Sequence, residues 1–400
     1  MSSVWSLRQS LFSKGNGGPT LRIYLDYAAT TPVDPEVLRA MELYLRDAFG
    51  NPSSIHSFGK EAKLAVEEAR RKVAALIGAR EEEVIFTSGG TEANNMVLWG
   101  FTIARVKKGG HIVTSSIEHP SILETCRFLQ SLGIDVTYVR VDRYGMVDPD
   151  EVRRAITPRT FLISIMHANN EVGTIQPIKE IAKVAKEAGI PFHTDAVQTV
   201  GHIPVNVDDL GVDLLSFSAH KMYGPKGIGG LYVREGILLL PFLRGGGQER
   251  GLRSGTENVP GIVGLGKAAE LAMRNLTEEM SRLQSLRDRF IKEVLARIPG
   301  AHLNGHPTQR LPGNAHFSFD RVEGEALVIN LDLEGVAVSS GAACHSRHLE
   351  PSHVLLAMGM DRSQALGAVR FSFGRWTREE HIEEVIEILQ RLIMSLRRVA

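Results

Sequence analysis

Short runs of apolar and β-branched residues recur between residues 83 and 233 and predict buried strands. Along the chain they read EVIFTS, HIVTSS, DVTYVRV, TFLISIM, PFHTD, LLSFSA and GGLYV. Between most of them lie segments with helical spacing, such as TEANNMVLWGFTIARV, SILETCRFLQSLG and PIKEIAKVAKEAG. Parallel strands need a long connection, usually a helix, so this alternation predicts a mostly parallel α/β sheet covered on both faces. Ligands of such a sheet bind at the C-terminal ends of its strands.

The pattern changes after about residue 255. A long helix is predicted near residues 260 to 296, followed by strands that include NAHFSF and AVRFSFG and by a final helix from about residue 377. These elements predict a second, smaller α+β unit. We therefore expect a tail at residues 1–22, a large domain at residues 23–255 and a small domain at residues 256–400.

The composition of the chain argues against nucleic acid or a membrane as its binding partner. Lys plus Arg and Asp plus Glu each total 46, so no basic excess favours nucleic acid or an anionic membrane. The longest apolar stretch, GILLLPFL, is far shorter than the ~20 residues of a membrane-spanning helix. With only Cys126 and Cys344, a disulfide framework is excluded, which favours the cytoplasm. The basic segment before Asp26 is typical either of a targeting segment or of a flexible N-terminal tail. Because the segment is short, we expect a flexible tail.

Three polar groups follow predicted strands. After EVIFTS, a turn with Gly90 opens a helix at Thr91, whose free N–H groups would suit a phosphate, although the glycines could equally just shape the turn. PFHTD delivers Asp195 to its C-terminal end, with Gln198 just beyond. LLSFSA delivers to the same edge three more side chains, Ser218, His220 and Lys221.

Taken separately, Asp195 could be a helix N-cap and Lys221 a solvated surface lysine. Taken together, the groups fit one chemistry. An amine can form a Schiff base, a carboxylate can pair with a pyridinium nitrogen and a helix N-terminus can hold a phosphate. The combination predicts pyridoxal 5'-phosphate as the cofactor.

Ten segments, in chain order, carry a resemblance to a known family: YLDYAATTPVDPEV, FGNPSSIHSFG, IFTSGGTEANN, SSIEHPSI, HANNEVGTIQP, HTDAVQTVG, SFSAHKMYGPKGIGGLYV, GGGQERGLRSGTENVPGIVG, SSGAACHS and VRFSFGR. This series closely resembles the motifs of pyridoxal-phosphate-dependent cysteine desulfurases, which are class V aminotransferases. The related selenocysteine lyases share much of it. The resemblance implies the fold of the type I pyridoxal phosphate enzymes, with a seven-stranded sheet in the large domain.

The resemblance also implies roles for individual residues. Lys221 would hold the cofactor covalently, Asp195 would lie against its ring nitrogen and Gln198 would bond its phenolic oxygen. Asn170 would lie beside the substrate and the ring oxygen. His119 would stack on the ring and move protons, although a histidine in such a loop could also be purely structural.

The remaining implied roles concern the phosphate and the substrate. The phosphate would be held by Gly90, Thr91, Ser218 and His220, with Thr256 reaching it from the partner subunit of a homodimer. Arg370 would bind the substrate carboxylate, which the fork of a guanidinium suits, although a surface ion pair is the alternative for a lone arginine.

Cys344 lies in SSGAACHSRHLEPSH, and three interpretations compete. A buried hydrophobe is disfavoured by its small and polar neighbours, and the spacing to His345, His348 and His353 matches no common zinc pattern, so no metal site is expected. A cysteine nucleophile must be accessible to the substrate and must be able to lose its proton. The small neighbouring residues provide accessibility, and the nearby imidazoles and Arg347 favour the thiolate. We therefore expect Cys344 to be a catalytic nucleophile and Cys126, within a helical pattern, to belong to the core.

The resemblance then implies an enzyme that converts L-cysteine to L-alanine. Cys344 would take the sulfur as a persulfide and deliver it to an acceptor, such as a scaffold protein of iron-sulfur cluster assembly. His345 and Ser346 after the nucleophile resemble selenocysteine lyases instead, whereas LEPSHVLLAMG resembles desulfurases with a long catalytic loop. Selenocysteine lyase is thus the alternative. An aminotransferase or a non-catalytic scaffold would not require Cys344, and the intact Lys221, Asp195 and His119 argue against a scaffold.

Overall fold

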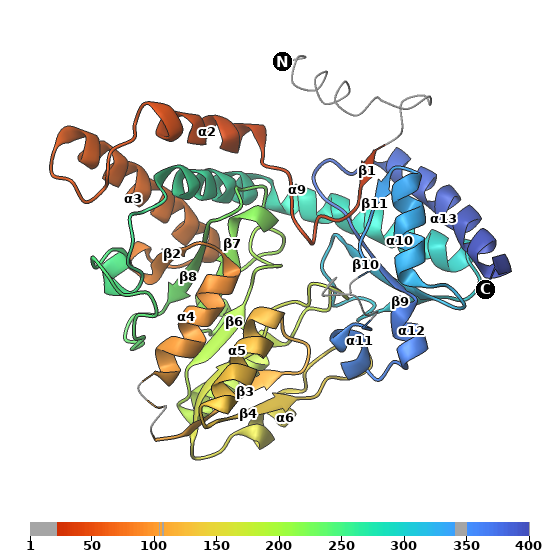
Figure 1. Ribbon diagram of the computed structural model, residues 1–400, viewed down its shortest axis with the longest axis horizontal. Helices are drawn as coiled ribbons and strands as arrows, with labels where there is room; N and C mark the ends of the chain where they lie inside the picture. Colours follow the sequence, from red (N-terminus) through yellow and green to blue (C-terminus); the bar gives the residue numbers. More distant parts are fainter. Residues whose placement is uncertain (1–21, 104, 106–107, 341–349, 400) are drawn as a thin grey trace.

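The large sheet lies in the left-hand part of the molecule in Figure 1, and a smaller unit lies to its right. The computed structural model describes residues 22–103, 105, 108–340 and 350–399. Seven strands form this sheet in the order β2-β8-β7-β6-β5-β3-β4. Their bounds are β2 Val84–Thr87, β3 Gly110–Ser115, β4 Ile134–Val139, β5 Thr160–Ser164, β6 Phe192–Asp195, β7 Leu214–Ser218 and β8 Gly229–Val233. Only β8 runs antiparallel to its neighbours in this sheet, so the predicted mostly parallel sheet is confirmed.

Both faces of the sheet are buried, which explains why its strands are continuous apolar runs. Successive side chains of a strand point to opposite faces. On β7, Leu214 packs in a cluster with α4 and α5, while Leu215 packs in a separate cluster with α3, α7 and α9. These helices are α3 Ser57–Ile77, α4 Gly90–Thr102, α5 Pro120–Ser131, α7 Ile178–Ala188 and α9 Val259–Arg297.

A smaller unit has its own core. Its antiparallel sheet has the order β12-β10-β9, formed by Ala368–Ser372, Asn314–Phe319 and Ala301–Asn304 respectively. Phe290 of α9, Phe317 of β10 and Phe371 of β12 meet in this core with ring centroids 5.0 to 6.3 Å apart. The helices α10 Gly324–Leu333 and α13 Glu379–Val399 also pack in it.

Two elements join the units. The first half of α9 packs in the large core through Ile262 and Leu265, and its second half packs in the small core through Leu286 and Phe290 (Figure 1). In addition, β1 (Ile23–Tyr24) pairs in parallel with β11 (Val336–Ala337) of the small unit. The chain then passes from the small core to the large one immediately after β1.

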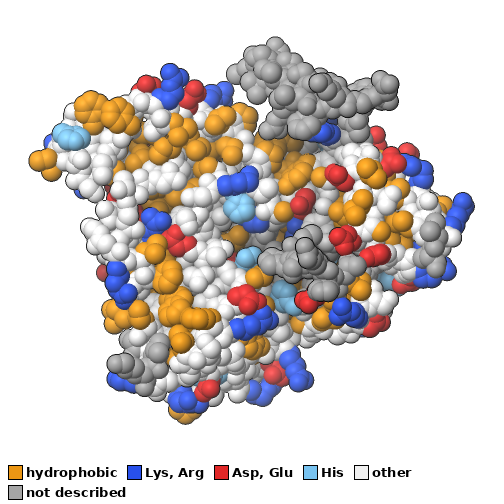
Figure 2. Space-filling view, in the orientation of Figure 1, with side chains coloured by type: hydrophobic (Ala, Val, Ile, Leu, Met, Phe, Trp, Pro, Cys, Tyr) orange, Lys and Arg blue, Asp and Glu red, His pale blue; other side chains and the backbone are white. Residues whose placement is uncertain are grey.

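The remaining helices are α2 Pro35–Arg46, α6 Pro149–Ala155, α8 Val207–Leu210, α11 His353–Ala357 and α12 Arg362–Leu366. Hydrophobic side chains gather on the surface over α2 and α3 (Figure 2). Within the described ranges, no helix is long and apolar enough to cross a membrane. The exact domain boundary expected at residues 255 and 256 stays a prediction, although α9 does begin close to it, at Val259.

Candidate active site

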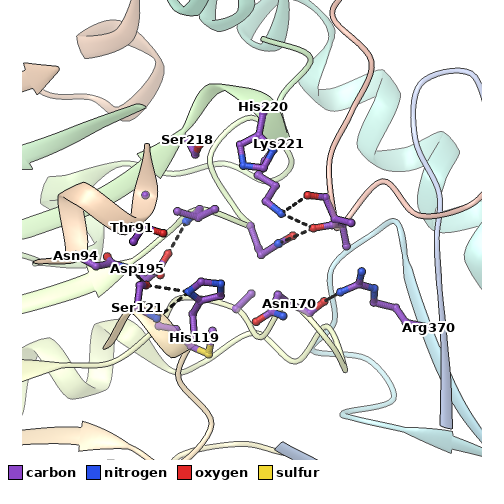
Figure 3. A pocket seen from close by; sticks show the side chains of 17 residues that line it. Thr91, Asn94, His119, Ser121, Asn170, Asp195, Ser218, His220, Lys221 and Arg370 are labelled. Carbon is purple, nitrogen blue, oxygen red and sulfur yellow. Dashed lines mark hydrogen bonds between the residues drawn. The ribbon is translucent and has the colours of Figure 1, made fainter. Parts of the chain in front are cut away.

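A cavity of about 380 Å³ lies at the C-terminal ends of β6 and β7. It brings together every predicted site residue except Thr256, which does not line it, and Cys344, which lies outside the described residues. Its lining residues are Ala28, Ala29, Gly90, Thr91, Asn94, His119, Ser121, Met166, Ala168, Asn170, Asp195, Val197, Gln198, Ser218, His220, Lys221 and Arg370. Figure 3 shows the labelled members converging on this space from separate elements.

Lys221 reaches the cavity from the short turn that follows β7. Its Nζ donates hydrogen bonds to the backbone oxygens of Ala28 at 2.6 Å and Ala29 at 2.7 Å (Figure 3). Loss of hydration in the cavity, together with the positive charge of Arg370, lowers the pKa of this amine to about 8. A larger fraction of Lys221 is therefore a neutral nucleophile near neutral pH than of an ordinary lysine.

Asp195 is the last residue of β6 and is only 6% exposed. Its Oδ1 accepts a hydrogen bond from the backbone N–H of Val197 at 3.0 Å, and its Oδ2 accepts one from Nδ2 of Asn94 at 2.7 Å. The residues after Asp195 form a turn, so it does not cap a helix. Gln198 in this turn donates to the backbone oxygen of Ala28 at 3.0 Å.

The turn before α4 needs glycine. A Cβ on Gly90 would lie 2.5 Å from a methyl group of Val197, well inside van der Waals contact. The backbone of α4 can therefore lie close to the turn after β6, and the first residues of the helix face the cavity. Both roles considered for these glycines, turn formation and phosphate binding, are compatible with this geometry.

His220 and Ser218 also line the cavity (Figure 3), and a Cβ on Gly89, just before α4, would lie 3.8 Å from Oγ of Ser218. Burial lowers the pKa of His220 to about 4, so this imidazole is neutral at physiological pH. Its Nδ1 lies 3.1 Å from Oγ1 of Thr30. A neutral imidazole beside a hydroxyl can serve as a hydrogen-bond donor to an anion without adding charge.

Arg370 lies on β12 of the small unit and is 5% exposed, so its ion pair is buried rather than on the surface. Its Nη2 donates to Oδ1 of Asp26 at 2.7 Å and its Nη1 donates to the backbone oxygen of Asn170 at 2.8 Å. Nε of Arg370 is buried and has no hydrogen-bond partner in the described part of the chain.

His119 is the N-cap residue of α5, so it has a structural role as well as a place in the cavity. Its Nδ1 accepts a hydrogen bond from the backbone N–H of Ser121 at 3.1 Å and lies 2.8 Å from Oγ of the same serine. Burial lowers the pKa of His119, which favours the neutral ring. The other ring nitrogen, Nε2, is left for the contents of the cavity.

The adjacent Glu118 is fully buried and was not expected from the sequence. Its Oε1 accepts hydrogen bonds from Oγ of Ser115 at 2.6 Å and from the backbone N–H of Met166 at 2.9 Å. Its Oε2 has no partner among the described residues. Burial raises the pKa of Glu118 to about 8, so this carboxyl group is largely protonated at neutral pH.

Of the two cysteines, only Cys126 lies within the described residues. Cys126 is fully buried in the cluster of α4 and α5, and burial raises the pKa of its thiol to about 12, which confirms its place in the core. Cys344, His345 and His348 lie outside the described residues. His353 has its Nε2 3.0 Å from the backbone oxygen of Glu118. Among the described residues, no cluster of three or more His, Cys, Asp or Glu side chains could hold a metal ion.

Sequence reasoning missed several groups at this site. Ala28 and Ala29 act through backbone oxygens, which every residue type has, so no sequence signal marks them. Asn94 carried a weak signal, since it lies one helical turn after Thr91 on the same helix. Asp26 precedes the small residues of the motif YLDYAATT, but its pairing with Arg370 spans most of the chain.

The comparisons with known proteins decide the family. The profile of the class-V aminotransferases matches residues 23–385. The chain belongs to the class-V aminotransferase family. Cysteine desulfurase IscS of Dictyoglomus turgidum is 56% identical over 378 residues, which are 94% of this chain and 96% of the relative. Cysteine desulfurase IscS of Methanosarcina thermophila is 53% identical and covers 94% of this chain and 93% of its own.

Solved structures agree with this class-V aminotransferase in fold. One described as a NifS-like protein has a TM-score of 0.88 and 41% identity, covering 94% of this chain and 100% of its own. Another, described as SspA in complex with cysteine, has a TM-score of 0.80 and 39% identity, covering 89% and 100% respectively. The predicted fold of the type I pyridoxal phosphate enzymes is thereby confirmed.

The cavity of this class-V aminotransferase fits pyridoxal phosphate. It offers an amine whose pKa is about 8, a carboxylate that is 6% exposed and a helix N-terminus whose first residue must be glycine. These groups match the aldehyde, the ring nitrogen and the phosphate of the cofactor. Class-V aminotransferases depend on this cofactor, so the cofactor predicted from the sequence is confirmed.

We expect the rate of covalent cofactor attachment to the apoprotein to rise with pH around a midpoint near 8. Only the neutral amine of Lys221 attacks an aldehyde, and its fraction grows as the pH rises through the lowered pKa of about 8. The absorbance change after mixing apoprotein with pyridoxal phosphate measures this rate from pH 6 to pH 10. Lys221→Ala should show no attachment after borohydride reduction and peptide mapping. A rate that is still rising steeply at pH 10, as the ordinary lysine pKa of 10.5 would require, would contradict the expectation.

We also expect Glu118→Gln to stabilise the protein at alkaline pH. The folded pKa of Glu118, about 8, lies above its ordinary 4.5, so the wild type loses stability as the pH rises from about 4.5 to about 8. Glutamine resembles the protonated carboxyl group but does not titrate, so the variant does not lose stability in this way as the pH rises. Urea unfolding at fixed protein concentration measures the free energy of unfolding of the variant and of the wild type. The difference between the two should grow from pH 5 to pH 8, by up to about 1.4 kcal/mol per pH unit, and then level off. A difference independent of pH would refute this reasoning.

Proposed function

We propose that the protein is a cysteine desulfurase, which converts L-cysteine to L-alanine and takes the sulfur on Cys344 as a persulfide. The observation that carries this proposal is the cavity itself, where Lys221, Asp195, His119 and Arg370 converge. The names of the relatives, at 46 to 56% identity for six of them, support the same reaction. The solved relative described as a complex with cysteine supports cysteine as the substrate.

In this proposal the residues around the cavity hold the cofactor. Lys221 attaches it covalently, Asp195 faces the ring nitrogen and Gln198 bonds the phenolic oxygen. The phosphate is held by Gly90, Thr91, Ser218 and His220, with Thr256 contributed by the partner subunit. When bound, pyridoxal phosphate supplies a sink for the electrons of bonds at the substrate α-carbon.

Arg370 and Asn170 orient the substrate. The guanidinium already donates to Asp26 and to the backbone oxygen of Asn170, so its position is fixed before the substrate arrives. The remaining Nη hydrogens are donors for the α-carboxylate. A carboxylate also compensates the charge of this buried guanidinium more fully than Asp26 does alone.

The chain moves protons with two groups. The amine of Lys221 would act as a base toward the proton on the α-carbon, because its lowered pKa suits proton removal near neutral pH. His119 holds a proton on the nitrogen that faces the cavity, because its Nδ1 is already an acceptor. It can therefore deliver a proton where negative charge develops on the substrate.

Cys344 performs the sulfur transfer. Its thiolate attacks the substrate sulfur, a bond between the two sulfur atoms forms and the bond from carbon to sulfur breaks. The electron pair of the broken bond stays with the carbon fragment, which takes up protons and leaves as alanine. The persulfide on Cys344 then passes its outer sulfur to a thiol of an acceptor, for which a scaffold protein of iron-sulfur cluster assembly stays our prediction. A cytoplasmic location also stays a prediction.

A homodimer is part of the proposal. Thr256 is exposed and does not line the cavity of its own chain. Both features are expected of a residue that contributes to the cavity of a partner subunit. Large apolar side chains are exposed on and beside α3: Ile55 at 90%, Phe49 at 71% and Leu64 at 71%. Hydrophobic side chains gather on the surface over α2 and α3 (Figure 2), and such gatherings mark interaction sites.

The segment that carries Thr256 is held firmly. Glu249, in a left-handed conformation with φ 46°, forms a buried ion pair with Arg70 at 2.7 Å. Arg253 pairs with Glu92 in the first turn of α4 at 2.8 Å. The segment is thus fixed against the phosphate end of its own subunit while Thr256 stays exposed, which supports a contact across a subunit interface.

Replacing the thiol should separate sulfur transfer from cofactor binding. Cys344→Ser should still attach the cofactor and bind L-cysteine, but it should form no alanine and carry no persulfide, because serine is a poor nucleophile at neutral pH. Alanine and sulfide are measured together after incubation with L-cysteine and a reductant, and persulfide by mass spectrometry. Cys126→Ser is the control and should keep its alanine production if it folds.

The same assay tests the alternatives. Alanine production by the serine variant at the wild-type rate would contradict the role of Cys344. A wild type that forms a keto acid instead of alanine would indicate an aminotransferase. Activity confined to selenocysteine would indicate a selenocysteine lyase and overturn the preference for sulfur.

An acidic substitution in the apolar region should weaken the dimer. Ile55→Asp places a charge where we expect an interface, and should raise the dissociation constant of the dimer at least tenfold in sedimentation analysis. Leu333→Asp is the matched control, because Leu333 is similarly exposed, at 75%, but lies on α10 of the small unit. A wild-type monomer that binds the cofactor at full strength would contradict the shared site.

A mixture of two defective subunits tests the contribution of Thr256. Thr256→Ala and Lys221→Ala should each weaken or abolish cofactor attachment alone. In a mixed dimer, the subunit that keeps Lys221 receives Thr256 from its partner, so one complete site forms. Cofactor affinity at that site should return to the wild-type value, and failure to recover would place Thr256 outside the partner's site.

A further inference from the structure

A chain of hydrogen bonds connects Asp195 to His119 through two residues to which the sequence assigned no role. Asn94, on α4, is 1% exposed. Its Nδ2 lies 2.7 Å from Oδ2 of Asp195 and 2.9 Å from Oγ of Ser121. Oγ of Ser121 lies in turn 2.8 Å from Nδ1 of His119 (Figure 3).

The direction of each hydrogen bond follows from the number of hydrogens available. The amide nitrogen of Asn94 has two hydrogens, and one goes to each of its two neighbours, Asp195 and Ser121. Ser121 therefore accepts at Oγ, and its own hydrogen is free to point to His119. Nδ1 of His119 also accepts from the backbone N–H of Ser121 at 3.1 Å, so this nitrogen carries no hydrogen in the neutral ring.

Asn94 has a further unusual feature. Its Oδ1 is buried and has no hydrogen-bond partner in the described part of the chain. A buried amide oxygen without a donor costs free energy, and an asparagine that served packing alone would have both ends of its amide satisfied. Rotating the amide would place Oδ1 against the Asp195 carboxylate, so the orientation with the unpartnered oxygen is the one that the site requires.

We propose that Asn94 is a positioning residue, which acts through Oγ of Ser121 to reinforce the placement of the His119 hydrogen on Nε2 that the backbone N–H of Ser121 favours, and which holds the carboxylate of Asp195 at the same time. The proposal rests on the proposed function for the meaning of His119 as a proton carrier. Asn94 makes one rigid unit of the two groups predicted to contact the cofactor ring. The proton on His119 then always faces the cavity, and the carboxylate cannot rotate away from it.

The effect of Asn94→Asp follows from the same geometry. A carboxylate at this position has no hydrogen to donate, repels Asp195 and accepts the hydrogen of the Ser121 hydroxyl. Oγ of Ser121 then presents a lone pair to Nδ1 of His119, which favours a hydrogen on Nδ1. Asn94→Ala removes the donor without adding the charge, so its effect should be smaller.

The test measures the tautomer of His119 directly. We would label the histidines of the full-length, cofactor-loaded protein with ¹⁵N and record the ring nitrogen spectra, assigning His119 by the signal lost in His119→Gln. The wild type should show only the Nε2–H form. Asn94→Asp should show a clear Nδ1–H or doubly protonated population, with a smaller one in Asn94→Ala. Ser121→Ala tests the same link with Asn94 intact and should also reduce the preference for Nε2–H.

Kinetics supply a second measurement. In Asn94→Asp we expect kcat for alanine formation to fall at least tenfold while KM for L-cysteine changes less than threefold, since Arg370 is untouched. The absorption spectrum of the bound cofactor should also shift, because Asp195 loses a partner. Asn95→Ala is the matched control: it removes a neighbouring amide of α4 that bonds Thr125 and the backbone of Thr91, and should leave the tautomer and kcat unchanged.

Failure of this proposal differs from failure of the proposed function. If all variants at residues 94 and 121 keep the pure Nε2–H form and the wild-type kcat, Asn94 has no positioning role. If the wild type forms no alanine from L-cysteine, the function is wrong, but the spectra still decide whether Asn94 sets the tautomer. A mixed tautomer in the wild type would overturn the proposal by itself.

Discussion

The contact between the amine of Lys221 and two backbone oxygens is the interaction on which the site depends. It fixes the amine inside the cavity, where burial lowers its pKa. The two oxygens belong to Ala28 and Ala29, in the segment that leaves β1. The same segment supplies Asp26 to Arg370, so one short stretch of chain positions both the group that binds the cofactor and the group expected to bind the substrate.

The parts of the site that the sequence predicted are those where side-chain type carries information. Strands buried on both faces must be apolar, so a polar residue at a strand end, such as Asp195 or Lys221, stands out against its neighbours. The parallel order of the strands then brings such ends to one edge. Fold and cofactor followed from these two constraints, and the family resemblance added the roles of His119, Asn170 and Arg370, which do line the same cavity.

The rest depends on contacts between distant residues. Asn94 is buried like an apolar residue. Its role depends on a hydrogen bond with Asp195, 101 positions later in the chain, which the sequence alone does not reveal. Glu118 reads as an ordinary surface residue of the motif SSIEHPSI, yet the fold encloses it completely. The carbonyl groups of Ala28 and Ala29 could not be predicted at all, because the backbone is the same everywhere. The roles of Thr256 and Cys344 stay predictions.

The pairing of β1 with β11 has a consequence for the order in which the protein forms during synthesis. Every strand of the large sheet lies before residue 234, so that sheet can assemble while the ribosome is still working. Residues 23 and 24, in contrast, must wait for residues 336 and 337, and Asp26 must wait for Arg370, 344 positions away. The substrate side of the cavity is thus completed only after Arg370 has been made, whereas every lining residue expected to hold the cofactor lies at or before Lys221. A chain that still lacks β12 would therefore carry the groups expected to hold the cofactor without the guanidinium expected to bind the substrate carboxylate.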